Sequence, residues 1–157
     1  MSEQTIRPKS LAKGILAGLI GGLVATAAKS LAERIYAPRT HGEPEPPELL
    51  AKKVAGYELT VVQKKVAAQA IHWGFGATTG AAYGALAEYI PTVTSKDGAN
   101  FGIALVTLTH QGALPALGLA ARPSEQTARE KTSEMTSHIV YGVVTETVRR
   151  VVRRLLR

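Results

Sequence analysis

Two glycine-rich runs decide the fold, GILAGLIGG at residues 14–22 and GATTGAAYG at residues 76–84. In each run a glycine recurs at every fourth position, and residues four apart lie on the same face of an α-helix. Because glycine has no side chain, each run predicts a helix with one smooth face. Such faces bring helices together in lipid, where association relies on close packing. The predicted helix-packing residues are Gly14, Gly18, Gly22, Gly76, Gly80 and Gly84.

The composition limits the classes of function. The chain has 157 residues, a length that suits one domain. It has no cysteine, which excludes disulfides, thiolate metal centres and cysteine nucleophiles. The formal net charge is +7, which is typical of proteins that bind nucleic acid or an anionic membrane surface. We find no phosphate-binding loop, zinc-protease helix motif or paired carboxylates at glycosidase-like spacing, so we predict neither a catalytic residue nor a metal site.

The apolar segments predict an all-α fold, a four-helix transmembrane bundle with glycine-zipper packing. Residues 66–87 and 98–121 are each long enough to cross a bilayer, although Pro115 should kink the later segment or end it early. We expect a single integral membrane domain over residues 1–157. Its expected elements are helices at about 11–36, 66–90, 98–121 and 133–157 and a polar loop at 37–63, with a short amphipathic helix after Pro47.

The first apolar segment allows a second interpretation. It has a basic start, an apolar core and the triplet Ala25-Thr26-Ala27, so it resembles a secretory signal. If the segment instead crosses the membrane, the distribution of Lys and Arg predicts the topology. Three bases precede it, seven lie in the first loop, one in the second loop and three in the third, and five end the chain. The first loop is long, and five acids accompany its seven bases. The short-loop rule then predicts cytoplasmic N- and C-termini for a multi-pass protein.

Three histidines and two glutamates form the candidate polar site: His72, His110, His138, Glu88 and Glu146. The expected helix directions place the histidines in one layer of the outer half. Ionisable groups at membrane depth usually face a bundle interior or a wet cavity. Neutral histidines that hydrogen-bond between helices are the simplest interpretation, and a proton or ion path is the second. A third is a metal or haem site with His72 and His138 as the axial pair.

The glutamates allow two interpretations of their own. Glu88 and Glu146 form ion pairs with nearby bases at the inner interface, or they mark the inner end of a polar path. A local repeat also links two segments. HWGFG at 72–76 and HIVYG at 138–142 share the pattern His-x-x-aromatic-Gly, which suggests a duplicated hairpin and adds Gly142 to the predicted packing glycines.

The end of the chain carries a basic cluster: Arg149, Arg150, Arg153, Arg154 and Arg157. No aromatic residues are interleaved with these arginines, and the cluster adjoins an apolar segment. We therefore expect anionic lipid on the cytoplasmic side, and not nucleic acid, as its partner. The glycine faces also predict self-association or other membrane subunits as partners.

The order of several short motifs resembles the YagU-like family of bacterial inner-membrane proteins. These motifs are HWGFG at 72–76, AYG at 82–84, FG at 101–102, PALGL at 115–119 and HIVYG at 138–142, followed by Glu146 and Arg149-Arg150. The resemblance covers roughly residues 14–154. It implies a multi-pass protein of the inner (plasma) membrane and supplies no catalytic residue.

Three functions are compatible with the sequence. The first is a structural or accessory membrane protein without a cofactor, as a homo-oligomer or a subunit of a larger membrane complex. The alternative is a minimal proton or ion pathway, or a pH-responsive membrane protein, that uses the intramembrane histidines. The third is a haem-binding electron-transfer subunit with His72 and His138 as ligands.

Overall fold

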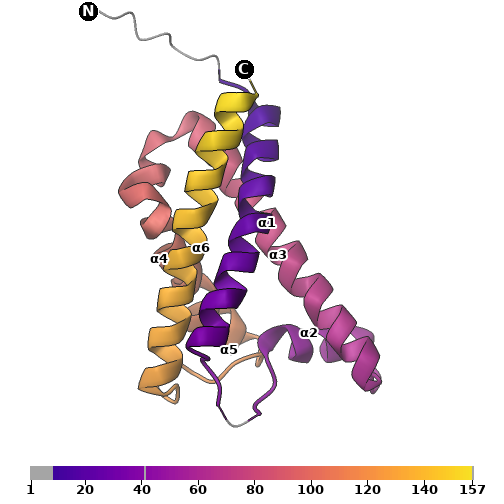
Figure 1. The fold of residues 1–157 in the computed structure, drawn as a ribbon. Coiled ribbons are helices and arrows are strands. Elements are labelled where there is room, and N and C mark those ends of the chain that lie inside the picture. The colour runs from indigo at the N-terminus through magenta and orange to yellow at the C-terminus, as the bar shows by residue number, and fades with distance from the viewer. Residues whose placement is uncertain (1–8, 41, 157) are drawn as a thin grey trace, which may run out of the picture.

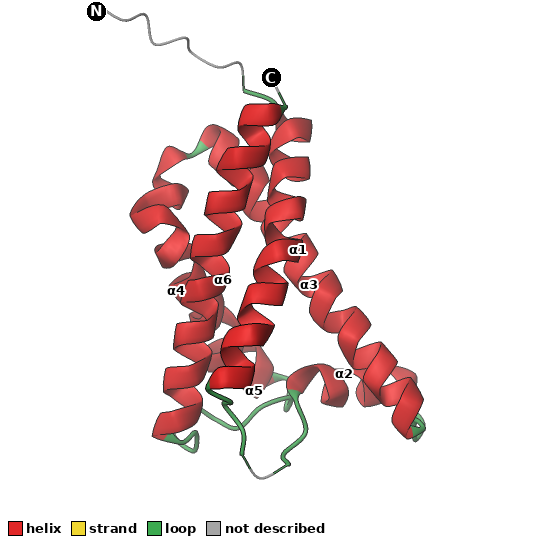
Figure 2. Ribbon diagram, viewed as in Figure 1, coloured by secondary structure: helices red, strands yellow, loops and turns green. Residues whose placement is uncertain are grey.

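The computed structural model describes residues 9–40 and 42–156. This part of the chain is entirely helical and contains no strand, which confirms the predicted all-α class (Figure 2). The start of the first long helix and the end of the last lie at the same end of the bundle (Figure 1). The longer helices alternate in direction in the order α1 (Leu11–Ile35), α3 (Val61–Tyr89), α4 (Ala99–Leu108) and α6 (Ala128–Leu155).

Local capping signals set the starts of the long helices. The Thr60 side chain accepts a hydrogen bond from the backbone N–H of Gln63, and the Gln63 side chain accepts one from the N–H of Thr60. This reciprocal capping box satisfies free N–H groups at the helix start, so α3 begins before the expected residue 66. The Thr127 side chain caps α6 by accepting a hydrogen bond from the backbone N–H of Glu130 at 3.1 Å. That helix also begins earlier than expected, because hydropathy alone does not register a polar first turn.

The connections between the long helices contain shorter elements. The loop expected at 37–63 contains α2 (Pro46–Ala55), and it ends where α3 begins. The expected helix at 98–121 is interrupted. After η1 (Pro91–Gly98), α4 ends at Leu108 and passes through a π-helical turn, η2 (Thr109–Ala113), into the three-residue α5 (Leu114–Ala116). Pro115 lies in this irregular region, where its missing N–H cannot support a regular helix.

The glycine faces of α1 and α3 lie directly against each other. A Cβ placed on Gly80 would lie 2.6 Å from the Cα of Gly22, and one placed on Gly84 would lie 2.7 Å from the Cα of Gly18. A Cβ on Gly14 would lie 2.7 Å from the carbonyl oxygen of Gly84. Backbone therefore touches backbone along this interface. The glycine face of α1 and the glycine face of α3 therefore pack against each other within one chain.

The His-x-x-aromatic-Gly repeat has a structural counterpart in two hairpins. Gly76 of α3 packs against Thr26 of α1, the long helix before it. Gly142 of α6 packs against α4, where a Cβ on Gly142 would lie 2.7 Å from the backbone nitrogen of Gly102. In each hairpin the glycine of the repeat thus lets the returning helix approach the preceding one. The helices α3 and α6 run in the same direction (Figure 1), but these two glycines face different neighbours.

The side chains in the interior of the bundle are mostly small or polar, and much of the exterior of the bundle is apolar. Half of the buried hydrophobic residues in the described part of the chain are alanines, and the others are Tyr83, Val106, Leu119 and Tyr141. The buried polar residues include Glu134, His138 and Glu146. Large apolar side chains lie outside on both α1 and α3. Those exposed on α1 are Leu11, Ile15, Leu16, Leu19, Leu23, Val24, Leu31 and Ile35.

One helix in the described part of the chain, α1, is long and apolar enough to cross a membrane by length and composition. It lies near the N-terminus, and signal sequences and the core helices of soluble proteins meet the same criterion. The helices α3 and α6 are long, but their average composition does not meet it. The four-helix transmembrane bundle expected from the sequence therefore stays a prediction.

Candidate functional site

The three predicted histidines line one cavity of about 640 Å³. His72 comes from α3, His110 from the π-helical turn η2 and His138 from α6. The cavity lies between the second half of α1 and the first half of α3, which diverge toward α2 (Figure 1). Both apolar and polar side chains line it. Trp73 and Phe75 are among the apolar lining residues.

The irregular end of the third segment positions His110. A π-helical turn contains an extra residue, and such turns frequently occur at functional sites. The buried Gln126 links two parts of the chain that flank residues 111–120. Its side-chain amide donates hydrogen bonds to the carbonyl oxygens of His110 at 3.1 Å and Ala121 at 2.9 Å. This arrangement turns the His110 ring toward α6.

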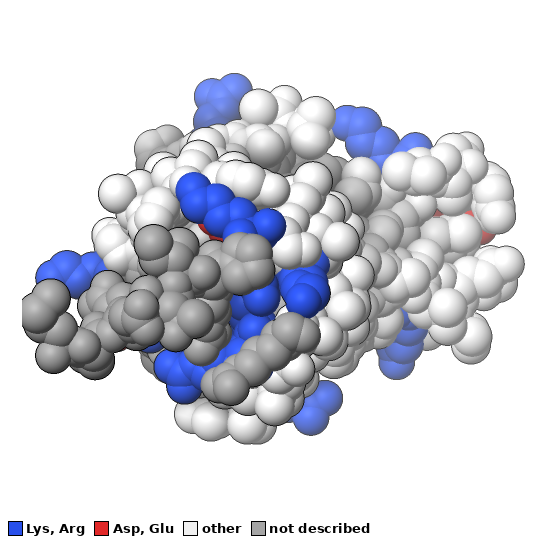
Figure 3. Space-filling view, turned by 90° about the horizontal axis from the view of Figure 1, so that it is seen from above, with Lys and Arg blue, Asp and Glu red and all other residues white. Residues whose placement is uncertain are grey.

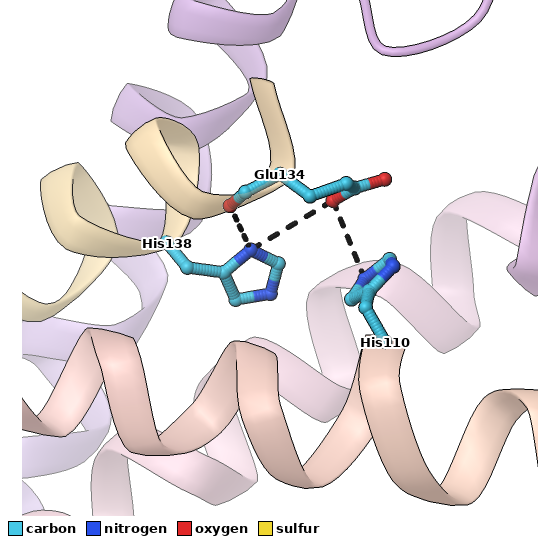
Figure 4. Close-up of side chains that lie close together, drawn as sticks. All are labelled: His110, Glu134 and His138. Carbon is cyan, nitrogen blue, oxygen red and sulfur yellow. Dashed lines mark hydrogen bonds and ion pairs between the residues drawn. The ribbon is translucent and has the colours of Figure 1, made fainter. Parts of the chain in front are cut away.

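Glu134 and His138 of α6 meet His110 at the cavity wall (Figure 4). Residues 134 and 138 are four apart, so their side chains share a helix face. His110 Nε2 lies 3.3 Å and His138 Nδ1 lies 3.8 Å from Glu134 Oε2. The two imidazole rings are in edge contact, with centroids 5.0 Å apart. Glu134 is 4% exposed, and its Oε2 atom has no hydrogen-bond partner.

Charged groups from α1, from the connection after it and from α6 surround this cluster. Arg39 lies 3.3 Å from Glu134 Oε1 through Nη1 and 3.1 Å from Glu130 Oε1 through Nη2. Lys29 and Glu33 of α1 form an ion pair with each other. The charged groups in these ion pairs are therefore three carboxylates and two cations. Within Glu134, Oε1 is the oxygen that pairs with Arg39.

His72 belongs to the same cavity but makes a separate contact. Its Nε2 lies 3.2 Å from Ser30 Oγ of α1, within hydrogen-bond distance. The ring in contact with His138 is that of His110. The structure thus brings all three histidines to one cavity, and it places His110, instead of the expected His72, against His138.

The opposite end of the bundle contains a second buried carboxylate, Glu146, which is fully paired. Arg149 donates to both of its oxygens, at 2.7 and 2.9 Å. The Tyr83 hydroxyl donates to Oε2 at 2.8 Å, and Arg150 donates to Oε1 at 2.6 Å. Arg150 also pairs with Asp97 at 2.8 Å. This end of the polar interior is closed by a network in which each Glu146 oxygen has two donors.

Glu88 is paired at the same end. Arg153 donates to its two oxygens, at 2.5 and 3.0 Å, and the backbone N–H of Ser10 donates to Oε2 at 3.1 Å. The expectation that the whole arginine cluster faces lipid is therefore wrong for two members. Arg149 and Arg153 are only 8% and 9% exposed, because buried carboxylates on α3 and α6 hold them inside the bundle. Arg157 lies outside the described residues.

Basic side chains nevertheless gather at this end of the surface. Seen along the bundle from the end where α1 begins, Lys and Arg dominate the charged side chains (Figure 3). Arg150 is half-exposed and Arg154 is exposed. Among the described residues, Lys9, Lys13 and Lys96 also have accessible side chains at this end.

Sequence reasoning missed several residues at these two ends. Glu134 was not among the predicted site residues, although its spacing of four from His138 predicts a shared helix face. Arg39 lies in a loop, and no local pattern links it to Glu134. Gly21 lies outside the four-residue ladder, yet a Cβ placed on it would lie 2.7 Å from the carbonyl oxygen of Thr145. Its neighbour Gly22 belongs to the ladder, so the pair serves two different interfaces.

The described part of the chain is therefore an all-helical bundle with polar groups in its interior and a cavity at one end. The chain belongs to the family described as protein of unknown function (DUF1440), whose family model matches residues 23–147. Comparisons with curated proteins and with solved structures found no match. The family description states no activity and no location, so the YagU-like name and the bacterial inner membrane remain predictions.

Proposed function

We propose that this chain is a small multi-pass membrane protein whose four long segments cross the bilayer in alternating directions. One observation carries the proposal, namely that α6 turns its polar face inward. In a helix that packs in water, the apolar face points to the core and the polar face to solvent. The inward-facing polar residues of α6 are Ser133, Glu134, Ser137, His138, Thr145, Glu146, Arg149 and Arg153.

The exterior of the bundle supports the same proposal. Bilayers provide no water to solvate polar groups, so polar side chains within a membrane face the bundle interior and pair with one another. Exposed leucine, isoleucine and valine side chains cover much of α1 and the start of α3. Glycine contacts between α1 and α3 supply the close backbone packing that stabilises helix pairs in lipid. Glycine lowers the average hydropathy of α3, and buried polar residues lower that of α6, together with bases at the helix ends such as Lys65 and Lys131.

Within this membrane protein, the cavity supports an accessory, ligand-holding role over an enzymatic one. The cavity lies at one end of the bundle, and the Glu146 network closes the other end. The glycine ladders are used inside the chain, so association with further copies or with other membrane subunits would use the apolar exterior instead. We place both termini at the cytoplasmic face, where the accessible bases of that end meet anionic lipid.

The alternative function, a proton or ion pathway, requires a polar route from one end of the bundle to the other. Its supporting observation is the set of three histidines on a single cavity. Against it, hydrogen bonds from Tyr83, Arg149 and Arg150 occupy the interior at the arginine end. A haem site remains a further alternative, and an absorbance spectrum of the purified protein tests it directly.

Two measurements test membrane insertion and topology. Alkaline carbonate washing of membranes should leave the full chain in the pellet, and its release into the supernatant would refute insertion. The natural chain has no cysteine, so single cysteines report topology without interference. We expect an impermeant thiol reagent to label Ser124→Cys in intact cells and to label Ser95→Cys only after permeabilisation. The reverse pattern would show that the termini face outward.

A further inference from the structure

We propose that His110, Glu134 and His138 bind a divalent transition-metal ion, with Zn²⁺ as the reference ion. This assigns a ligand to the cavity described above, and it rests on the accessory, ligand-holding role proposed for that cavity. The three residues come from two elements, the π-helical turn η2 and α6, so the tertiary structure creates the site.

The spacing of the donor atoms suits such an ion. One nitrogen from each imidazole and one carboxylate oxygen lie within 4.8 Å of one another. Zinc bonds to nitrogen and oxygen measure about 2.0–2.2 Å, and in a tetrahedral site they separate neighbouring donors by roughly 3.3 Å. The 3.3 Å distance between His110 Nε2 and Glu134 Oε2 already matches this separation. The His138 ring must turn so that its Nε2 completes the set, because its Nδ1, 3.8 Å from Glu134 Oε2, is hydrogen-bonded to the backbone carbonyl of Glu134.

The unpartnered oxygen of Glu134 is an independent indication of a ligand. A buried carboxylate oxygen without a hydrogen bond is costly, and buried polar atoms in proteins rarely lack a partner. Glu134 Oε2 is such an atom, and the His110–His138 pair flanks it. A divalent ion between the two rings and this oxygen would give Oε2 the partner that it lacks.

Neighbouring bonds prepare the ligands for metal binding. His138 Nδ1 donates a hydrogen bond to the backbone carbonyl of Glu134 at 2.7 Å, which fixes a neutral tautomer with a lone pair on Nε2. Metal-binding histidines commonly use their second nitrogen in this way. Arg39 holds Glu134 Oε1 and leaves Oε2 for the ion.

The donor set also indicates the class of ion. Imidazole with carboxylate suits Zn²⁺, Co²⁺, Ni²⁺ or Fe²⁺, whereas Mg²⁺ and Ca²⁺ prefer oxygen ligands alone. The charged side chains beside the site, Lys29, Glu33, Arg39, Glu130 and Glu134, carry one negative charge in excess, so a divalent cation is not repelled. Three protein ligands leave a fourth position toward the cavity, the pattern of an open site and not of a closed structural one.

Zn²⁺ and Co²⁺ are the probes for the test. The full chain, purified in mild detergent and treated with chelator, should bind one Zn²⁺ per chain by calorimetry. Co²⁺ should give the visible absorption of a four-coordinate site, and excess Mg²⁺ should not displace it. Absence of stoichiometric Zn²⁺ binding by the natural chain would overturn the proposal, whatever the variants do.

Matched variants assign the ligands. Glu134→Gln and His110→Gln should each weaken Zn²⁺ binding at least tenfold, and Zn²⁺ should no longer raise their melting temperature. Glu130→Gln and His72→Gln remove the same types of group from the same neighbourhood and should retain binding near that of the natural chain. Equal loss in both sets would assign the ion to some other site.

The result is separable from that for the proposed membrane function. Carbonate extraction reports insertion, and metal titration reports the site. A chain that washes off membranes but binds Zn²⁺ through His110 and Glu134 would refute the membrane proposal and retain the metal site. A chain that stays in the membrane and binds no Zn²⁺ would do the opposite.

Discussion

The two buried glutamates of α6 have opposite surroundings. Glu146 is completely buried and accepts hydrogen bonds from Tyr83, Arg149 and Arg150. Glu134, three turns earlier, is almost as buried, but its Oε2 atom has no hydrogen-bond partner and faces two histidines at an open cavity. Full pairing at one end is what stability requires of a buried charge. Incomplete pairing at the other end is the observation from which we propose a ligand there.

Backbone packing differs between the same two regions. Near the Glu146 end, glycines bring α1 and α3 into direct backbone contact. Toward the Glu134 end, α3 diverges from α1 and the cavity opens between them (Figure 1). The ladder holds the helices together over half of their length, and this leaves the other half available for a site.

The largest predicted effect comes from breaking the paired glutamate. Glu146→Gln removes the charge that compensates the buried Arg149 guanidinium, and loss of one partner of a buried pair costs about 3–5 kcal/mol. We expect the melting temperature of the full chain in mild detergent to fall strongly. If the fall is no larger than that for Glu134→Gln, the contrast between the two ends is refuted.

The glycine interface offers a matched pair of substitutions in one helix. Gly80→Ala introduces a Cβ that would lie 2.6 Å from the Cα of Gly22, so the helices must separate. We expect a loss of about 1–3 kcal/mol in unfolding free energy from this overpacking. A Cβ on Gly74 meets no atom within 4 Å, and Gly74→Ala should stabilise α3 by up to about 1 kcal/mol. Similar melting temperatures for the two variants would count against the glycine contact.

The bulkier substitution extends the same test. Gly80→Leu should greatly reduce the yield of folded protein, whereas Ala85→Leu should reduce it less, because residue 85 lies off the ladder face. Size-exclusion chromatography in mild detergent measures the folded fraction. Equal loss for both variants would show that bulk anywhere in α3 is harmful and that the ladder has no special role.

A smaller effect is predicted at the unpartnered glutamate. Without metal, Glu134→Gln removes a costly buried charge but also weakens the contact with Arg39, which keeps Glu130 as a partner. These terms oppose each other, so we expect a net change within about 1 kcal/mol. Added Zn²⁺ should then distinguish the natural chain from the Glu134→Gln variant, because it should raise the melting temperature of the natural chain alone. A large loss of stability without metal would show that Glu134 is structural.

The smallest effect is expected outside both regions, at the pair between Lys52 and Glu58. These side chains lie 2.5 Å apart and are mostly exposed, and exposed ion pairs contribute little. The Lys52 ammonium lowers the pKa of Glu58 through a hydrogen bond and its charge. Any contribution is therefore present above the ordinary carboxyl pKa and is lost as the pH falls through the lowered one. Lys52→Gln should leave the melting profile unchanged at neutral pH, and it provides the baseline for the larger effects.

Part of the candidate site was accessible from the sequence. The histidines were identified because ionisable residues are rare in apolar segments, and the expected helix directions placed them in one layer. Glu134 was not identified, although it shares a helix face with His138. The contact of His110 with Glu134 depends on a π-helical turn, and hydropathy gives no signal for such a turn. Arg149 and Arg153 were expected to face lipid, because a run of arginines does not reveal which buried carboxylates lie opposite.

The sequence by itself determined the helical class and the glycine faces, because residues four apart share a helix face whatever the rest of the chain does. Local capping at Thr60 and Thr127 sets two helix starts, although hydropathy had placed those starts later, at about residues 66 and 133. Only the tertiary structure decided that the two ladders meet each other, that Arg153 turns inward to Glu88 and that His110 reaches Glu134. Each of these contacts joins residues far apart in the chain. Their formation depends on how whole helices pack, and local periodicity carries no information about the partner.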